Sequence, residues 1–335
     1  MAKKIFYGVC AAIALLSCTL FAFIDYSRNF NRPLFYEHYI TYNVRAAYRD
    51  TQATAQMQQA LHDDPGRIED QDFSWEGLSN PSYYTVEWIG IAAAINTGHT
   101  LQITSAVLDL NELGVYKLNN VNDSVYKDEQ PYEWTDDDEH IGVVSGTQFK
   151  TGVSAMAFEP EDLKALAEAI VNPVTVESML VNYIYDGKEY TENVPIGKIT
   201  LYSADSSLDR LTEDTTPARP NMTQMSRPGG AASLSFQPRP GCTVESVSLP
   251  YPSVTGDLMS LTIEQDADGT IRAGRANFDG QGLICLQLDY IVRGIDADGA
   301  EVTTVTDYQN YSFCTLSTGA QNVLTELKNR RGGDE

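Results

Sequence analysis

Apolar residues first gather in one uninterrupted run near the start of the chain. Residues 5–24 carry no charge, and Lys3 and Lys4 precede them. As a helix rising ~1.5 Å per residue, this run reaches about 30 Å, the thickness of a bilayer's hydrocarbon core. The pattern predicts a transmembrane signal anchor at 5–24, with residues 1–4 in the cytoplasm and the rest extracytoplasmic, at the cell membrane.

Two other interpretations of this run stay open. Ala12-Ile13-Ala14 has the composition of a signal-peptide cleavage site, and "LLSC", ending at Cys18, is similar to the cleavage site of a bacterial lipoprotein. A cleaved signal peptide normally has an apolar region of only about 7–15 residues. Further apolar residues also follow Cys18, where a lipoprotein usually turns polar. The length of the run therefore favours an uncleaved anchor.

The next segment, residues 25–81, shows helical spacing. Spacings of four and three separate Ile40, Val44, Ala47, Thr51, Thr54, Gln58 and Leu61. This pattern predicts a juxtamembrane stalk helix that lies on the next domain, with a coiled-coil dimer as the alternative. The polar stretch "DDPGRIEDQD" ends the predicted helix.

From residue 82 the apolar period changes to two. Segments such as "YYTVEWIGIAAAI", "TLQITSAVLDL" and "VTVESMLVNYIY" are rich in Val, Ile, Thr and aromatic residues and predict strands. Glu159-Pro160 followed by "EDLKALAEAI" predicts one short helix, because proline and acidic residues favour a first helical turn. Asp186-Gly187 predicts a hairpin turn. We interpret residues 82–205 as a first β-sandwich domain.

A second β-rich unit follows a linker. Residues 206–232 lack periodicity and are rich in Pro, Thr and Gly, which is typical of an exposed linker. Strand patterns return over residues 233–317, with near-identical turns at Asp266–Gly269 and Asp296–Gly299. Asp and Gly suit tight antiparallel turns, so these favour a second β-sandwich. Residues 318–335 predict a C-terminal helix and tail.

One hairpin carries a resemblance. The stretch "LDYIVRGIDADGAEVTTVTDY" is similar to hairpins of bacterial immunoglobulin-like surface domains. The predicted fold class is therefore mainly β: an N-terminal transmembrane helix and a stalk helix, followed by two antiparallel β-sandwich (Ig-like) domains.

Charge and cysteine content narrow the function. The net charge is −23, and a nucleic acid would be repelled by it. The negative charge is consistent with solubility and with binding to cations or to basic partners. The cysteines show no zinc spacing. Cys285 and Cys314 predict either one disulfide in an oxidising compartment or two buried thiols, and both stay open.

Chemical motifs are scarce. No H-E-x-x-H, G-x-S-x-G or phosphate-binding glycine loop occurs, so no catalytic residue is predicted. The acidic run Asp136, Asp137, Asp138 and Glu139 is the sharpest metal candidate, because Ca²⁺ prefers several oxygen ligands. The motif of a calcium-binding loop is absent, which favours a solvated acidic loop instead. Tyr132 and Trp134, which precede the acidic run, are candidates for stacking on a ligand. No cofactor other than calcium is suggested.

These observations predict a noncatalytic, membrane-anchored extracytoplasmic protein that binds another envelope protein or a surface ligand, or assists envelope assembly. Two alternatives are a calcium-dependent envelope hydrolase acting through the acidic run and a cell-surface glycan-binding protein. A sensor across the membrane is disfavoured, because about four cytoplasmic residues are too few to fold.

Overall fold

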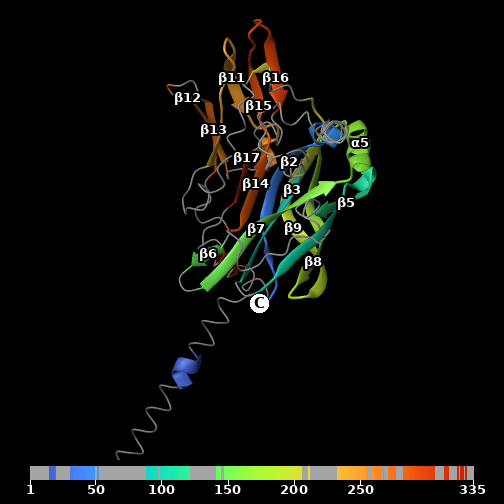
Figure 1. Cartoon of the computed structure of the whole chain (residues 1–335), viewed down its shortest axis with the longest axis vertical. Coiled ribbons are helices and arrows are strands. Elements are labelled where there is room, and N and C mark those ends of the chain that lie inside the picture. Colours follow the sequence, from blue (N-terminus) through green and yellow to red (C-terminus); the bar gives the residue numbers. More distant parts are fainter. Residues whose placement is uncertain are drawn as a thin grey trace, which may run out of the picture.

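The computed structural model describes the chain in separate stretches. These are residues 15–19, 31–49, 51–52, 88–96, 99–120, 141–144, 147–205, 210–211, 232–254, 259–265, 267, 271–276, 282–305, 313–316, 323, 325–327 and 329. Figure 1 shows the chain with its longest axis vertical. The β15–β16 turn lies at the top of this view, and the β8–β9 turn lies near the bottom of the β-rich part.

Strands dominate the described stretches. The large sheet contains β1 (Leu34–Phe35), β2 (Glu37–Asn43), β3 (Ile89–Asn96), β4 (Leu101–Asp109), β5 (Val115–Asn120), β6 (Ile141–Val144), β7 (Thr147–Phe158), β8 (Val174–Tyr185), β9 (Lys188–Tyr202), β14 (Ile284–Leu288) and β17 (Phe313–Leu316). One small sheet contains β10 (Ala232–Phe236), β13 (Ile271–Ala276) and β12 (Met259–Gln265), and another contains β11 (Thr243–Ser248), β15 (Ile291–Ile295) and β16 (Glu301–Val305). The helices include η2 (Asn111–Leu113), α5 (Pro160–Ala169) and η5 (Pro252–Val254).

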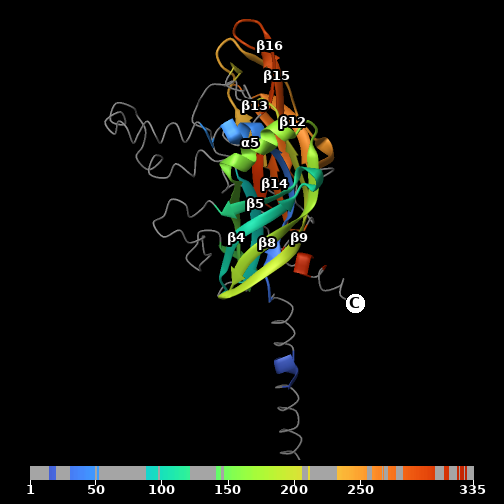
Figure 2. The ribbon, with the colours of Figure 1, turned by 90° about the vertical axis from the view of Figure 1, so that its right-hand side faces the viewer.

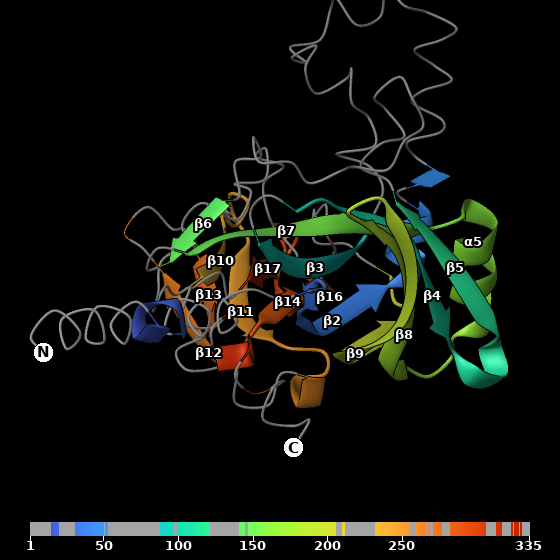
Figure 3. The ribbon, with the colours of Figure 1, turned by 90° about the horizontal axis from the view of Figure 1, so that it is seen from below.

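The large sheet curls until the continuous β1–β2 stretch meets strands from both of its sides. β1 pairs with β3, and β2 pairs in parallel with β9. Between β3 and β9 the strand order is β7, β5, β4 and β8, with every neighbouring pair antiparallel. Figure 3 shows this curl from below, and Figure 2 shows α5 across its upper end. The larger of two apolar cores lies inside the curl.

The structure has strands at residues 34–43, so the predicted stalk helix is wrong for this stretch. Side chains at every second position are each at most 2% exposed: Tyr36, His38, Ile40, Tyr42 and Val44. Thr41 and Asn43, on the opposite face, are buried as well. A spacing of four, as between Ile40 and Val44, suits one face of a strand as well as one face of a helix. A helix follows only at residues 44–49 and 51–52. Residues 53–81 lie outside the described stretches.

Beyond its two-residue pairing with β1, the backbone of β3 is hydrogen-bonded by two side chains, His38 of β2 and Gln287 of β14. The Ala92 N–H donates to His38 Nε2 at 2.8 Å. The Gly90 N–H donates to Gln287 Oε1 at 3.1 Å, and Gln287 Nε2 donates to the Trp88 carbonyl at 2.6 Å. His38 is 0% and Gln287 3% exposed. Buried polar groups need such partners, so side chains here take the role that a neighbouring strand has elsewhere.

The large sheet crosses the predicted domain boundary. β14, from the predicted second unit, pairs in parallel with β2 and antiparallel with β17. All five β14 residues are buried and all but Gln287 are apolar, which is typical of a strand covered on both faces. Across β14 and β17, Cys285 lies opposite Leu316 and Cys314 opposite Gln287, so the two cysteines are not directly opposed. Most of the predicted linker, 206–209 and 212–231, lies outside the described residues.

A second core lies against the outer side of β2. It contains residues of β11, β13, β14, β15 and β16, and Tyr39 of β2 packs against it. Even-numbered residues of β2, such as Ile40 and Tyr42, belong to the larger core instead. Since side chains alternate along a strand, β2 contributes one face to each core.

Several local predictions are confirmed. α5 begins with Pro160 and buries Leu163 and Leu166, as the apolar spacing predicts. The β8–β9 hairpin turns at Asp186 and Gly187, with φ of 48° and 73°; glycine adopts this left-handed region without strain. Near the C-terminus the described residues 323, 325–327 and 329 are helical.

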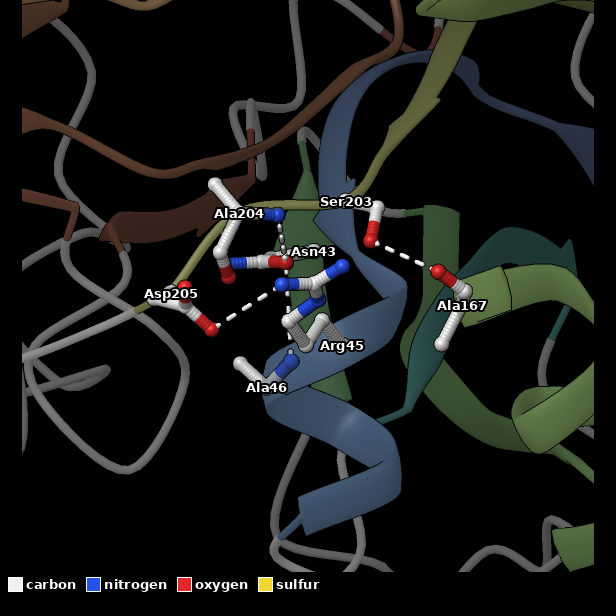
Figure 4. A network of polar contacts seen from close by, with 7 residues as sticks. All are labelled: Asn43, Arg45, Ala46, Ala167, Ser203, Ala204 and Asp205. Atoms are coloured by element: carbon white, nitrogen blue, oxygen red, sulfur yellow. Dashed lines mark hydrogen bonds and ion pairs between the residues drawn. The ribbon is translucent and has the colours of Figure 1, made fainter. Parts of the chain in front are cut away.

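A polar network joins the ends of β2, β9 and α5 (Figure 4). Asn43 Oδ1 accepts from the N–H groups of Ala204 (3.1 Å) and Ala46 (3.5 Å), and Asn43 Nδ2 donates to the Ala204 carbonyl (2.9 Å). Asn43 thereby caps the helix that follows β2. Arg45 pairs with Asp205 at 3.2 Å on the exposed side. This network fixes the upper end of the curl, opposite the β8–β9 turn.

Of the predicted membrane span at 5–24, the structure describes residues 15–19 as helical, with Leu15 and Leu16 each 69% exposed. Within the described stretches, no helix is long and apolar enough to cross a membrane. The remaining residues of the predicted span lie outside those stretches.

We expect the folded protein to lose stability between pH 7.5 and pH 5, because His38 must stay neutral. Burial lowers the pKa of His38 to about 4, and the Tyr36 backbone partly offsets this. The unfolded chain keeps the ordinary pKa of 6.5, so it binds more protons between these values. The His38 contribution is complete above pH 6.5 and is lost as pH falls toward 4. Urea denaturation should show a loss of about 2 kcal/mol from this residue.

The matched variant is His38→Gln, whose amide oxygen can accept the Ala92 bond without titrating. Its pH dependence should be smaller than that of the wild type by the same amount. Gln52→Leu, which alters an exposed helical residue that does not titrate, should retain the wild-type dependence. Equal slopes in the wild type and His38→Gln would contradict the role given to His38.

A second prediction concerns Gln287. Gln287→Leu removes the acceptor of the buried Gly90 N–H and the donor to the Trp88 carbonyl. An unsatisfied buried donor costs about 1–3 kcal/mol, so the free energy of unfolding should fall by at least that amount. Gln52→Leu, at an exposed helical position, should change it by less than about 0.5 kcal/mol. Similar values for both variants, measured by urea denaturation, would show that the Gln287 contacts are unimportant.

Candidate functional site

The residues predicted from the sequence fall outside what the structure describes. Tyr132 and Trp134, and the acidic run Asp136, Asp137, Asp138 and Glu139, lie between β5 and β6 in an undescribed segment. Among the described residues, no group of three or more His, Cys, Asp or Glu side chains is placed to hold a metal ion. The calcium and stacking sites therefore stay predictions.

One of the two Asp-Ala-Asp-Gly turns is described, and its own backbone uses the aspartate. Asp296 Oδ1 accepts from the N–H groups of Asp298 (3.1 Å) and Ala300 (2.9 Å). Arg210 donates to the other carboxylate oxygen. Gly299 has a φ of 82°. These contacts are those of a tight turn, and they hold the pKa of Asp296 below its usual range.

β8 and β9 join at the lower end of the curled sheet (Figure 2). A cluster of aromatic and charged side chains lies beside this turn. We call it the tyrosine cluster. Its buried part consists of Phe35, Tyr183 and Tyr185, its half-buried part of Tyr190 and Glu192, and its exposed rim of Arg32, His99 and Asp186.

The hairpin register brings the tyrosines together. Across the turn, Tyr185 lies opposite Lys188, and Tyr183 lies opposite Tyr190. Directly opposed residues share one face of a sheet, so Tyr183 and Tyr190 stack, with ring centroids 5.3 Å apart and planes inclined by 16°. Phe35 of β1 meets the edge of the Tyr183 ring at 5.5 Å. The aromatic part of the cluster therefore joins β1, β8 and β9.

Glu192 forms the acidic part of one half of the cluster. The Tyr183 hydroxyl donates to Glu192 Oε2 at 2.9 Å, and Arg32 Nη1 lies 4.0 Å from the same oxygen. The Arg32 guanidinium also lies over the Tyr190 ring, 5.5 Å from its centroid. Burial raises the pKa of Tyr183, and the bond to Glu192 raises it further, so its hydroxyl stays a donor.

His99 and Asp186 form the other half. His99 Nδ1–H donates to Asp186 Oδ2 at 2.6 Å, and the Thr100 N–H donates to Asp186 Oδ1 at 3.0 Å. The His99 ring stacks on Tyr185, with centroids 5.4 Å apart and planes inclined by 13°. Both side chains are about two-fifths exposed (40% and 43%). Asp186 and the Tyr185 ring thus orient the imidazole.

Tyr185 contributes a buried hydroxyl. The residue is 4% exposed, and its hydroxyl has no hydrogen-bond partner among the described residues. Burial raises its pKa, and the nearby Asp186 and Tyr190 raise it further, so the group is a neutral donor. Buried polar groups are normally hydrogen-bonded, and this hydroxyl is one of the exceptions among the described residues.

A second set of polar contacts joins Thr41 of β2, Tyr202 of β9 and Asp289, which follows β14. Asp289, 3% exposed, accepts a hydrogen bond from the Tyr202 hydroxyl at 2.7 Å and donates its N–H to Thr41 Oγ1 at 2.7 Å. Tyr251 meets the Tyr202 ring edge-on at 5.3 Å. Burial raises the pKa of Tyr251, and Asp289 adds to the effect. These groups satisfy one another inside the protein, so we assign them to the stability of the fold.

Part of the tyrosine cluster had a signal in the sequence. In a hairpin that turns at Asp186-Gly187, the residue three positions before Asp186 pairs with the residue three positions after Gly187. These residues are Tyr183 and Tyr190. Arg32 and His99 had no such signal, because they reach the cluster from segments far away in the chain. The sequence therefore identified the turn and missed the site around it.

Comparison with known proteins adds no assignment. No protein-family model matches the chain, and no curated protein matches it. The contacts of the tyrosine cluster are therefore the basis for proposing a function.

The His99–Asp186 contact gives a test of the local geometry. Burial raises the pKa of Asp186, but the hydrogen bonds from His99 and the Thr100 N–H outweigh this and hold the pKa below its usual range. The stabilisation from Asp186 is present above its unfolded pKa and is lost as pH falls through the lowered value. His99→Ala should raise the pKa of Asp186, as followed by NMR titration of the carboxyl carbon.

Tyr185→Phe is the matched control, because it keeps the ring that stacks on His99 and leaves both Asp186 bonds in place. Its Asp186 titration should coincide with that of the wild type. If His99→Ala also left the Asp186 titration unchanged, the His99 hydrogen bond would not exist in solution.

Proposed function

We propose that this chain is a noncatalytic binding protein, anchored in the membrane by residues 5–24, whose β-rich part binds a partner protein of the cell envelope on the extracytoplasmic side. The observation that carries the proposal is the tyrosine cluster. It combines rigid, buried aromatic rings with charged side chains at an exposed rim. Aromatic side chains with a polar tip, and Arg, are enriched where proteins bind one another.

The anchor rests on the uncharged run at 5–24 and on two exposed side chains. Leu15 and Leu16 are each 69% exposed in a helical turn, and a bilayer would cover such side chains. In Figures 1 and 2 this turn lies below the end of the β-rich part that carries the β8–β9 turn. With the anchor in a membrane, the tyrosine cluster would face the membrane side, where a partner anchored in the same membrane can reach it.

The charge of the chain supports a protein partner with a basic surface. A net charge of −23 repels nucleic acids and anionic lipids and attracts cationic surfaces. We also propose that residues 233–317 are immunoglobulin-like. The support for this is the pair of three-stranded antiparallel sheets β10-β13-β12 and β11-β15-β16.

Site-specific photo-crosslinking in cells tests the proposal. A photoreactive amino acid replaces Lys188, which is exposed in the β8–β9 turn, or Asp298, which is exposed in the β15–β16 turn at the opposite end (Figure 1). We expect position 188 to give a discrete adduct with one envelope protein and position 298 to give none. Mass spectrometry of the same bait should recover an intact N-terminal peptide from the membrane fraction.

The result that would overturn the proposal is an equal pattern at both positions, or no adduct at position 188 in a well-expressed, membrane-bound bait. A glycan ligand would then become the better candidate. An N-terminus cleaved after residue 14, or lipid on Cys18, would replace the anchor with one of the other two interpretations of the apolar run.

A further inference from the structure

The tyrosine cluster already holds a cation from its own chain. The Arg32 guanidinium lies 5.5 Å from the centroid of the Tyr190 ring, and Arg32 Nη1 lies 4.0 Å from Glu192 Oε2. An aromatic face beside a carboxylate is a favourable environment for a guanidinium, because the ring supplies a negative face and the acid supplies the countercharge. We call Tyr190 and Glu192 the cation seat.

Tyr183 holds both residues of the cation seat in place. Tyr183, 1% exposed, stacks on Tyr190 at 5.3 Å and donates its hydroxyl to Glu192 Oε2 at 2.9 Å. One buried residue therefore positions both the ring and the carboxylate. Phe35 in turn packs on the edge of Tyr183. Groups that are ordered before binding lose less conformational freedom when a ligand arrives.

Arg32 itself is weakly held. Its side chain is 63% exposed, and its contact with Glu192 is at the outer limit of an ion pair. Exposed pairs of this kind contribute little, because water and salt screen them. Glu192, in contrast, is only 35% exposed and has a second partner in Tyr183. Glu192 is therefore held in position by the protein, whereas Arg32 can be replaced by another cation.

We propose that the cation seat binds an arginine side chain of a basic segment in the partner protein, and that Arg32 occupies the seat in the unbound protein. This inference rests on the proposed function and names the chemistry of its partner. Charge complementarity supports it, since a chain with a net charge of −23 attracts a basic segment before contact.

Self-occupation has a measurable consequence. A site that its own Arg32 fills for part of the time shows an apparent affinity reduced by the fraction that is vacant. Removing Arg32 should therefore strengthen binding. Removing any other positive charge would also strengthen binding of a basic peptide by long-range attraction, so a charge-matched control is needed. Arg45 supplies it, because it pairs with Asp205 at the far end of the curl.

The experiment measures fluorescence anisotropy of a labelled peptide with three arginines separated by glycines, titrated with the full-length protein in detergent micelles at 0.15 M salt. The same peptide with citrulline, a neutral isostere of arginine, reports contacts that do not need the charge. We expect the arginine peptide to bind and the citrulline peptide to bind at least about tenfold more weakly. Arg32→Ala should strengthen binding of the arginine peptide severalfold more than Arg45→Ala does.

Two carboxylate variants locate the site. Glu192→Gln keeps an acceptor for the Tyr183 hydroxyl and loses the charge, so it should weaken binding by about tenfold. Glu189→Gln removes the same charge from the same strand. Residue 189 is three positions from residue 192 and therefore on the opposite face of β9, so this variant should stay within about twofold of the wild type. Unchanged circular dichroism would show that both variants are folded.

Equal losses in Glu192→Gln and Glu189→Gln, or equal gains in Arg32→Ala and Arg45→Ala, would show that binding depends only on net charge. Either result would contradict the proposal that the cation seat binds arginine. Weaker binding in Arg32→Ala would overturn the idea that Arg32 occupies the seat. A discrete envelope-protein adduct at position 188 would leave the proposed function standing in either case, because the crosslink does not depend on arginine recognition.

Discussion

The curled sheet depends on side chains that satisfy one strand's backbone where no neighbouring strand does. β3 is paired with β7 on one side and with β1 for only two residues on the other. Beyond that point, His38 accepts from the Ala92 N–H, and Gln287 bonds the Gly90 N–H and the Trp88 carbonyl. These groups are buried, so leaving them unbonded would cost a large part of a typical protein's stability. The neutral imidazole and the amide are therefore requirements of the fold.

This constraint explains why β2 is central. The strand must carry His38 toward β3, pair with β9 on one side and with β14 on the other, and contribute a face to each of two cores. A strand with these neighbours has no solvent-exposed edge for most of its length. Its residues are accordingly aromatic, aliphatic or hydrogen-bonded polar. The same placement ties the C-terminal strands β14 and β17 to the N-terminal part of the chain.

Local features could be predicted from the sequence, and long-range ones could not. Proline and acidic residues at the start of α5, and Asp186-Gly187 in the β8–β9 turn, act through neighbouring residues, so their effect is visible in a short stretch. β2 shows the limit, because Ile40 and Val44 are four residues apart and that spacing fits a helix face and a strand face alike. Only its partners β9 and β14, which lie more than 150 residues away in the chain, decide between the two. The site was missed for the same reason, since Arg32 and His99 come from segments distant from the hairpin.

The position of the tyrosine cluster follows from the way the core ends. The inward positions of β9 are Tyr190 and Glu192, which are half-buried, and Val194 and Ile196, which are buried. On β8 the inward side chains change in parallel, from Met179 and Val181 in the middle to Tyr183 and Tyr185 at the end. Aliphatic residues fill the dry interior, and residues with an apolar ring and a polar tip suit the boundary with water. The boundary therefore gathers ordered rings and hydrogen-bonding groups at one exposed place. The core holds these groups in position, and Arg32 already lies among them. The proposed binding surface is therefore a consequence of how the core ends, with its rings and its acceptor ordered by residues that the fold needs in any case.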